Sequence, residues 1–191
     1  PTYNFYSITN TSAVNVSIGE SQLSMTVSDI GPGQASFLFE NSGDQAGVLA
    51  DIYLEDMDSL LIFNAFEPFE MGVAFDESKK KNLNLPGGNQ PHVDFTETSA
   101  FVADNPAPHK GVGPDELVEL IFDLQNLSYT DLLDAVDSGD LRVGIHVTSF
   151  ENGGSESFVT NDPPPVVPVP SSIILSTLGL AMLGVYRKRN L

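Results

Sequence analysis

Residues 23–39, LSMTVSDIGPGQASFLF, carry the strongest strand pattern of the chain and indicate its fold class. Apolar residues occupy every second position from Leu23 to Val27, and again from Ala35 to Phe39. The residues between these two runs, 29–33, are rich in turn formers. Because successive side chains of a strand point to opposite faces, the pattern predicts an antiparallel hairpin with one buried face.

Similar short runs recur along the chain and predict an all-β fold. About nine strands in roughly 160 residues favour two layers of antiparallel strands over other architectures, and we expect a jelly-roll-like β-sandwich. Besides the two strands of the hairpin, the predicted strands cover 47–54, 60–66, 71–75, 93–103, 116–124, 141–150 and 155–160.

One segment, 129–138, departs from the period of two and predicts one short helix. Leu132, Leu133 and Val136 have helical spacing. Ser128 precedes the segment, with an acidic residue three positions later, as in a capping box, and Gly139 provides a stop.

Composition limits both the organisation and the partners of the protein. A chain of 191 residues suits one domain with appendages, which we place at 1–162. This body holds all 26 Asp and Glu but only five Lys and Arg, a net charge of −21. Because nucleic-acid binding depends on contacts between cations and phosphates, nucleic acid is not an expected partner. The chain has no cysteine, which excludes disulfides and thiolate chemistry.

The motifs of enzymes are missing from the sequence, and we predict no enzymatic activity. No G-x-S-x-G elbow or H-E-x-x-H pair occurs. His92 and His109 fall in proline-rich connections. His146 has the opposite parity to the aliphatic residues of its predicted strand, so it should point away from the core.

Four carboxylates close together in the sequence are the candidate metal ligands. Calcium takes six to eight oxygen ligands, mostly carboxylates and carbonyls. The spacing does not match a calcium-binding loop, so a solvated acidic strand end is the alternative explanation. No other cofactor is expected. The four candidates are Asp51, Glu55, Asp56 and Asp58.

The C-terminal segment has three parts in a fixed order. A proline-rich linker, 163–172, is followed by 14 uncharged residues, 173–186, and by a basic end, 187–191. As a helix, 173–186 would be about 21 Å long, against about 30 Å of bilayer hydrocarbon. We expect a transmembrane helix with a cytoplasmic basic end, and a weak anchor of this length suits a segment that is later cut. A permanent anchor or a C-terminal strand are the alternatives.

This arrangement resembles the PEP-CTERM sorting signal of Gram-negative bacteria, in its VPxP variant. Val169 stands where the commonest motif has Glu, and looser similarities to members of this family occur in the body, at 18–23, 85–89, 141–147 and 153–158. The residues that match the motif are Pro168, Val169, Pro170, Ser171 and Ser172, and those that match the basic stop are Arg187, Lys188 and Arg189.

The resemblance implies a route and a place rather than a reaction. It implies export, transient retention in the inner membrane, processing by exosortase, a membrane transpeptidase, and delivery to the cell surface or to an exopolysaccharide matrix. We therefore expect a structural or adhesive protein of the surface or biofilm matrix. The alternatives are a carbohydrate-binding module, which would use a sheet face or the loops 82–91 and 104–115, and, less in keeping with the sequence, a hydrolase of matrix polymer.

Overall fold

The computed structural model describes residues 1–67, 72–80 and 82–160. The linker 163–172, the apolar segment 173–186 and the basic end 187–191 lie outside the described residues, as do both parts of the sorting signal. Within the described part of the chain, no helix is long and apolar enough to cross a membrane.

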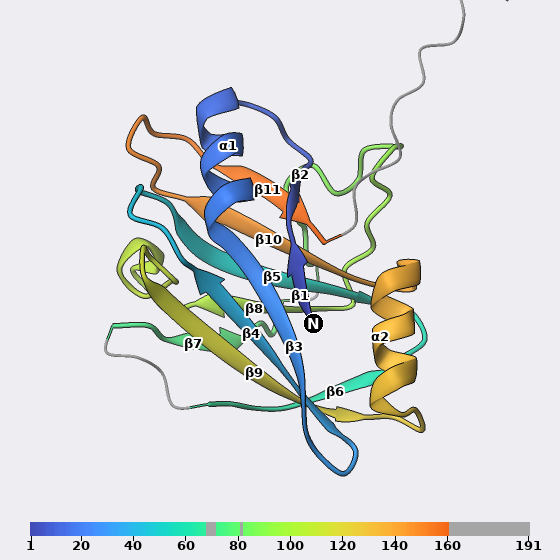
Figure 1. Ribbon diagram of the computed structural model, residues 1–191. Coiled ribbons are helices and arrows are strands. Elements are labelled where there is room, and N and C mark those ends of the chain that lie inside the picture. Colours follow the sequence, from blue (N-terminus) through green and yellow to red (C-terminus); the bar gives the residue numbers. More distant parts are fainter. Residues whose placement is uncertain (68–71, 81, 161–191) are drawn as a thin grey trace, which may run out of the picture.

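The described residues form two antiparallel sheets (Figure 1). Sheet A has the order β1 (Thr2–Asn4), β3 (Leu23–Gly31), β4 (Gln34–Asn41), β9 (Glu116–Leu124) and β6 (Leu61–Phe66). Sheet B has the order β2 (Tyr6–Ser7), β11 (Glu156–Val159), β10 (Leu141–Thr148), β5 (Val48–Asp56), β8 (Ser99–Ala103) and β7 (Phe75–Glu77). The predicted all-β class is confirmed.

The hairpin of β3 and β4 is confirmed with the predicted buried face. Met25 lies opposite Phe39 and Val27 opposite Phe37, and all four side chains are fully buried. The turn ends at Gly33, whose φ of 74° lies in the left-handed region that glycine adopts without strain.

The two sheets pack face to face around a shared core. Phe101 of β8 in sheet B lies against Phe122 of β9 in sheet A, with ring centroids 5.8 Å apart. Phe63 of β6 contacts Phe101 from the side of sheet A at 4.7 Å. Because a fully buried Phe contributes about 1.5–3 kcal/mol, Phe101 and Phe122 are a large part of what holds the layers together.

The predicted helix is present as α2 (Tyr129–Ser138). Ser128 and Asp131 form the capping box, and Gly139 ends the helix with φ at 84°. Leu132 and Val136 are buried in the shared core. The hydroxyl of Tyr129 donates a hydrogen bond to the carbonyl of Val27 at 2.9 Å, so α2 is also attached to β3.

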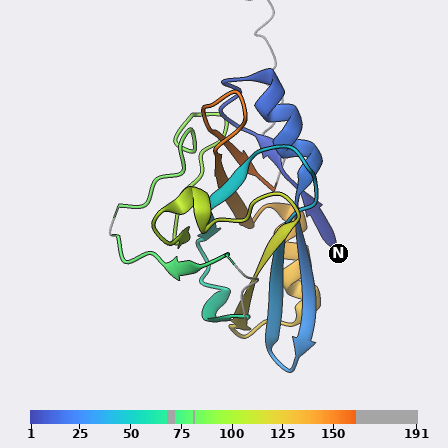
Figure 2. The ribbon, with the colours of Figure 1, turned by 90° about the vertical axis from the view of Figure 1, so that its left-hand side faces the viewer.

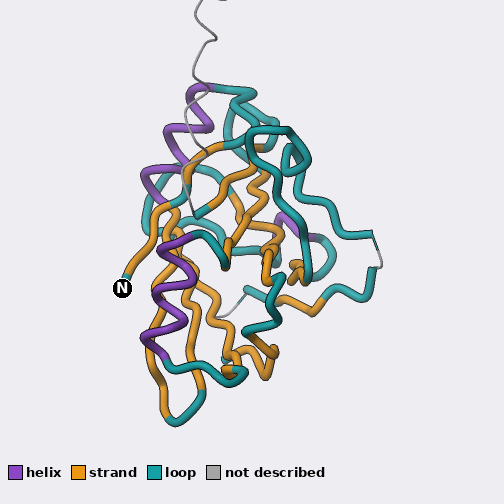
Figure 3. Tube along the Cα trace, turned by 90° about the vertical axis from the view of Figure 1, so that its right-hand side faces the viewer, coloured by secondary structure: helices purple, strands orange, loops and turns teal. Residues whose placement is uncertain are grey.

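A second helix, α1 (Ala13–Gln22), was not predicted. Ser12 caps it by accepting a hydrogen bond from the amide of Asn15. Gly19 lies against Phe158 of β11, since a Cβ at this position would come within 2.1 Å of the ring. Figures 2 and 3 show α1 and α2 on one side of the molecule and the long connection 82–98 on the other.

Two predicted strands differ from the structure. Of the strand predicted at 93–103, only β8 (Ser99–Ala103) exists, because residues 93–97 belong to the connection that folds over sheet B. Of the strand predicted at 71–75, residue 71 lies outside the described part, and β7 begins only at Phe75. The predicted loop 104–115 contains a short 3-10 helix, η1 (Ala107–His109).

Candidate functional site

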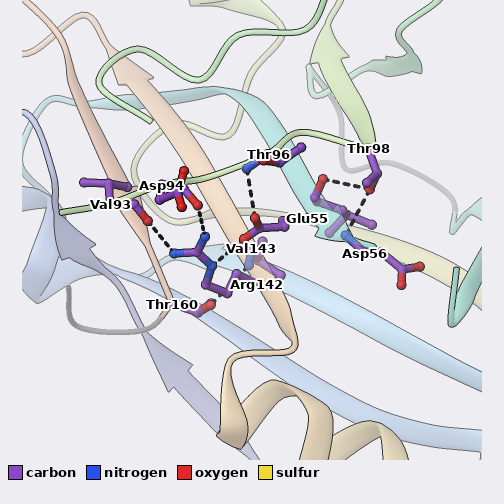
Figure 4. Close-up of polar contacts among 10 residues, drawn as sticks. Glu55, Asp56, Val93, Asp94, Thr96, Thr98, Arg142, Val143 and Thr160 are labelled. Carbon is purple, nitrogen blue, oxygen red and sulfur yellow. Dashed lines mark hydrogen bonds and ion pairs between the residues drawn. The ribbon is translucent and has the colours of Figure 1, made fainter. Parts of the chain in front are cut away.

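Arg142 of β10 clamps the connection 82–98 onto the outer face of sheet B (Figure 4). Its guanidinium pairs with Glu55, the residue opposite it on β5. It also donates hydrogen bonds to the carbonyls of Val93, at 2.7 Å, and Asp94, at 2.5 Å. The guanidinium lies 5.3 Å from the ring centre of Phe95, a cation–π distance.

A small apolar cluster lies beneath this clamp. Leu85, Val93 and Phe95 are buried against Tyr53 of β5, and Gly144 of β10 leaves room for Leu85. A Cβ at Gly144 would come within 2.6 Å of Leu85 Cδ2. The connection therefore covers sheet B with its apolar side chains, which is a structural role.

The four predicted calcium ligands have different partners. Asp51 lies 3.1 Å from Nδ1 of His146, whose predicted outward orientation is confirmed. Glu55 pairs with Arg142 and also accepts a hydrogen bond from the amide of Thr96.

The other two candidates lie at the turn that follows β5. Asp56 accepts hydrogen bonds from the amides of Leu60, at 2.8 Å, and Leu61, at 2.9 Å, and so shapes the turn. Asp58 lines a shallow hollow beside α2 together with Asp131 and other carboxylates. Within the described residues, no group of three His, Cys, Asp or Glu side chains is placed to hold a metal ion. The calcium site stays a prediction.

A buried carboxylate that the sequence did not point to is that of Glu156 in β11, only 1% exposed. It accepts hydrogen bonds from the hydroxyls of Thr9 and Thr11 and from the amides of Thr11 and Ser12. Burial raises the pKa of Glu156, but these hydrogen bonds outweigh burial and hold the pKa below its ordinary value. Glu156 thereby fixes the segment that leads into α1.

A hollow that is open to a ligand lies at one edge of the molecule, and we call it the edge hollow. It lies between β6, the edge strand of sheet A, and β7, the edge strand of sheet B, and encloses about 740 Å³. Half-buried Phe63 and Phe66 form its apolar wall. Its polar wall comes from the last two residues of β7, 76 and 77, and from residues 78–80 that follow the strand. The run of three lysines at 79–81 is the sequence feature that could have pointed to this hollow.

The polar wall of the edge hollow has two kinds of charge. Asp76 and Glu77 bring carboxylates, and Lys79 and Lys80 bring ammonium groups; all four side chains are exposed. The two ion pairs within the described part of the chain are those of Arg142 and His146, so neither lysine has a carboxylate within 4 Å there.

Comparison with protein-family models, with curated proteins and with solved structures finds no match for this chain.

Proposed function

We propose that this chain is an exported protein of the cell surface or extracellular matrix, with a structural or adhesive role and no enzymatic activity. The observation that carries the proposal is the order of linker, apolar segment and basic end after an acidic domain.

The charge of the body is consistent with this location. Of its 26 acidic residues, few are engaged with cations: within the described residues, only Glu55 and Asp51 have a basic partner within 4 Å. A surface with so many solvated carboxylates keeps a protein soluble and repels nucleic acid and anionic lipid. Calcium could bridge such surfaces in a matrix, and this cation role is part of the proposal.

The proposal also includes a finer fold and a transient membrane stage. We propose a jelly-roll-like strand order, since the chain repeatedly crosses between the two sheets from β4 to β10. The precursor is held in the inner membrane by 173–186 until an exosortase-type transpeptidase cuts the proline-rich segment.

Intact mass tests the sorting role. The protein is recovered from cells that contain the transpeptidase and from cells that lack it. We expect a loss of mass that corresponds to a cut within 166–172 only when the transpeptidase is present. A second strain carries Pro168→Ala with Pro170→Ala, which should retain the full mass. The full mass in every strain would overturn the proposal.

Binding of carbohydrate is a second candidate function, and the edge hollow favours it. Sugar-binding sites commonly use aromatic rings beside polar groups, and the hollow offers two rings at the sheet edges. The loop 82–91 offers less, because Leu85 is fully buried against sheet B.

A further inference from the structure

The edge hollow concentrates positive charge on a protein that has very little of it. Residues 1–162 contain five Lys and Arg, and two of them, Lys79 and Lys80, line this one hollow. Arg142 is held by Glu55 and by backbone carbonyls on the outer face of sheet B, so it is not available to a ligand. The two lysines balance the carboxylates of Asp76 and Glu77, so an anionic ligand meets less repulsion in this hollow than over the acidic surface of the body.

The apolar wall sets the second requirement for the ligand. Phe63 and Phe66 lie with ring centroids 4.8 Å apart, and both are packed from behind against Phe101. Their packing holds the rings in place before any ligand arrives. A ligand that fits must present an apolar face to them, as the C–H face of a pyranose ring does.

Hydrogen-bonding groups beside the lysines set the third requirement. Asp76 and Glu77 accept hydrogen bonds only, so they suit a ligand with hydroxyl donors. The hydroxyl of Ser78 accepts a hydrogen bond from the amide of Lys80 and can still donate one. Hydroxyls, carboxylates and an apolar ring face are combined in sugars that carry a uronate group.

We propose that the edge hollow binds a uronate-bearing saccharide, with its ring on Phe63 and Phe66, its carboxylate on Lys79 and Lys80, and its hydroxyls on the acidic residues of β7. This inference deepens the proposed matrix role, on which it rests, by naming the chemical class of the glycan. An acidic peptide added as a strand at the edge of β7 would meet the lysines but would make no use of the paired rings.

Isothermal titration of the full chain tests the assignment. The probes are tetragalacturonate, the neutral tetrasaccharide cellotetraose and a tetraglutamate peptide, in a polyoxyethylene detergent that has no sugar headgroup. We expect tetragalacturonate to bind more tightly than either of the others, with an affinity that falls as salt rises from 20 to 200 mM, which shortens the Debye length.

Three variants locate the binding site. Lys79→Gln with Lys80→Gln should weaken tetragalacturonate about tenfold, the sum expected for two exposed ion pairs. Phe66→Leu should also weaken the binding of tetragalacturonate. Leu keeps most of the apolar volume of Phe, and an unchanged melting temperature will show that this variant is folded. Lys110→Gln, which removes one cation beside η1, is the matched control and should leave the affinity unchanged.

Several results would overturn the assignment. They are no binding of tetragalacturonate, equal binding of cellotetraose, binding of the peptide in its place, or equal losses from Lys110→Gln and the double lysine variant. If the lysines only protect an edge strand from pairing with another strand, tetragalacturonate should not bind. Because the titration uses purified protein, it is independent of the mass experiment, so the saccharide site and the sorting role can fail separately.

Discussion

The carboxylate of Glu156 joins the start of the chain to its last described strand. It receives hydrogen bonds from Thr9, Thr11 and Ser12, more than 140 residues away in the sequence. Hydrogen bonds to an ionised group contribute about 1.5–3 kcal/mol each in favourable cases, and a buried carboxylate left without them is costly. With four hydrogen bonds, this carboxylate ties residues 9–12 firmly to β11.

Glu156→Gln should lower the free energy of unfolding by about 2 kcal/mol at pH 7, because an amide replaces an acceptor-only group among four donors. The folded pKa lies below the ordinary value of about 4.3, so the stabilisation is complete above that value and is lost as pH falls through the folded pKa. The difference between the two proteins should therefore shrink below about pH 4.

Urea unfolding between pH 7 and pH 3 measures this difference. The exposed Glu151, in the turn before β11, provides the control variant Glu151→Gln, which should stay within about 0.5 kcal/mol of the unmodified protein. A difference that stays constant to pH 3 would contradict the role of the ionised carboxylate.

At the scale of elements, helix α1 depends on one close approach. Gly19 is buried against Phe158, and a Cβ there would come within 2.1 Å of the ring. Helix propensity alone favours Ala over Gly by about 1 kcal/mol, so propensity and packing predict opposite signs for the same substitution. The cost of overpacking should exceed the gain in helix propensity, because three ring atoms of Phe158 would lie closer than 3 Å to the added Cβ.

We expect Gly19→Ala to lower the free energy of unfolding by about 2 kcal/mol, measured by urea titration followed by circular dichroism. Ser17→Ala, on the exposed side of the same helix, should instead raise it by about 0.5 kcal/mol. Phe158→Leu combined with Gly19→Ala should cost less stability than the sum of the two single variants, because the smaller side chain makes room for the methyl group. A stabilising effect of Gly19→Ala would show that α1 does not pack as described.

The same elements show which parts of the fold could be predicted. The β3–β4 hairpin was predictable because burial of one face imposes a period of two, and α2 because its caps and apolar stripe agree. Helix α1 was not, because Asn15 and Gly19 stand among its buried positions, where an apolar stripe would be expected. Residues 93–97 alternate like a strand, but some of their backbone groups form hydrogen bonds with side chains in place of a neighbouring strand. Arg142 donates to the carbonyls of 93 and 94, and Glu55 accepts from the amide of 96.

The candidate sites could also be predicted only in part. The outward orientation of His146 followed from parity, which local sequence carries. The hydrogen-bond partners of Glu55, Asp56 and Glu156 lie 4 to 147 positions away in the sequence, and only the folded chain brings them together. The edge hollow likewise forms only because β6 and β7 are edge strands of two different sheets, a position that the sequence of either strand does not indicate.

For the whole molecule, the unbalanced charge has a consequence for stability. A body with a net charge of −21 repels itself, and repulsion between exposed charges is screened as the Debye length falls from about 20 Å at low salt to about 8 Å at 0.15 M. We therefore expect the melting temperature of the full chain to rise by about 3 °C between 20 and 200 mM NaCl, equivalent to about 1 kcal/mol for a domain of this size.

A comparison of melting temperatures in different salts at the same ionic strength separates the effect of calcium binding from that of ionic screening. If calcium bridges carboxylates of the body, CaCl₂ should raise the melting temperature beyond NaCl and MgCl₂, because a cation that binds only the folded state stabilises it by mass action. Light scattering should then show association of molecules with CaCl₂ alone, as a cross-linking role in a matrix requires. Equal melting temperatures in the three salts would remove calcium from the proposed function and leave the charge to act only through solubility.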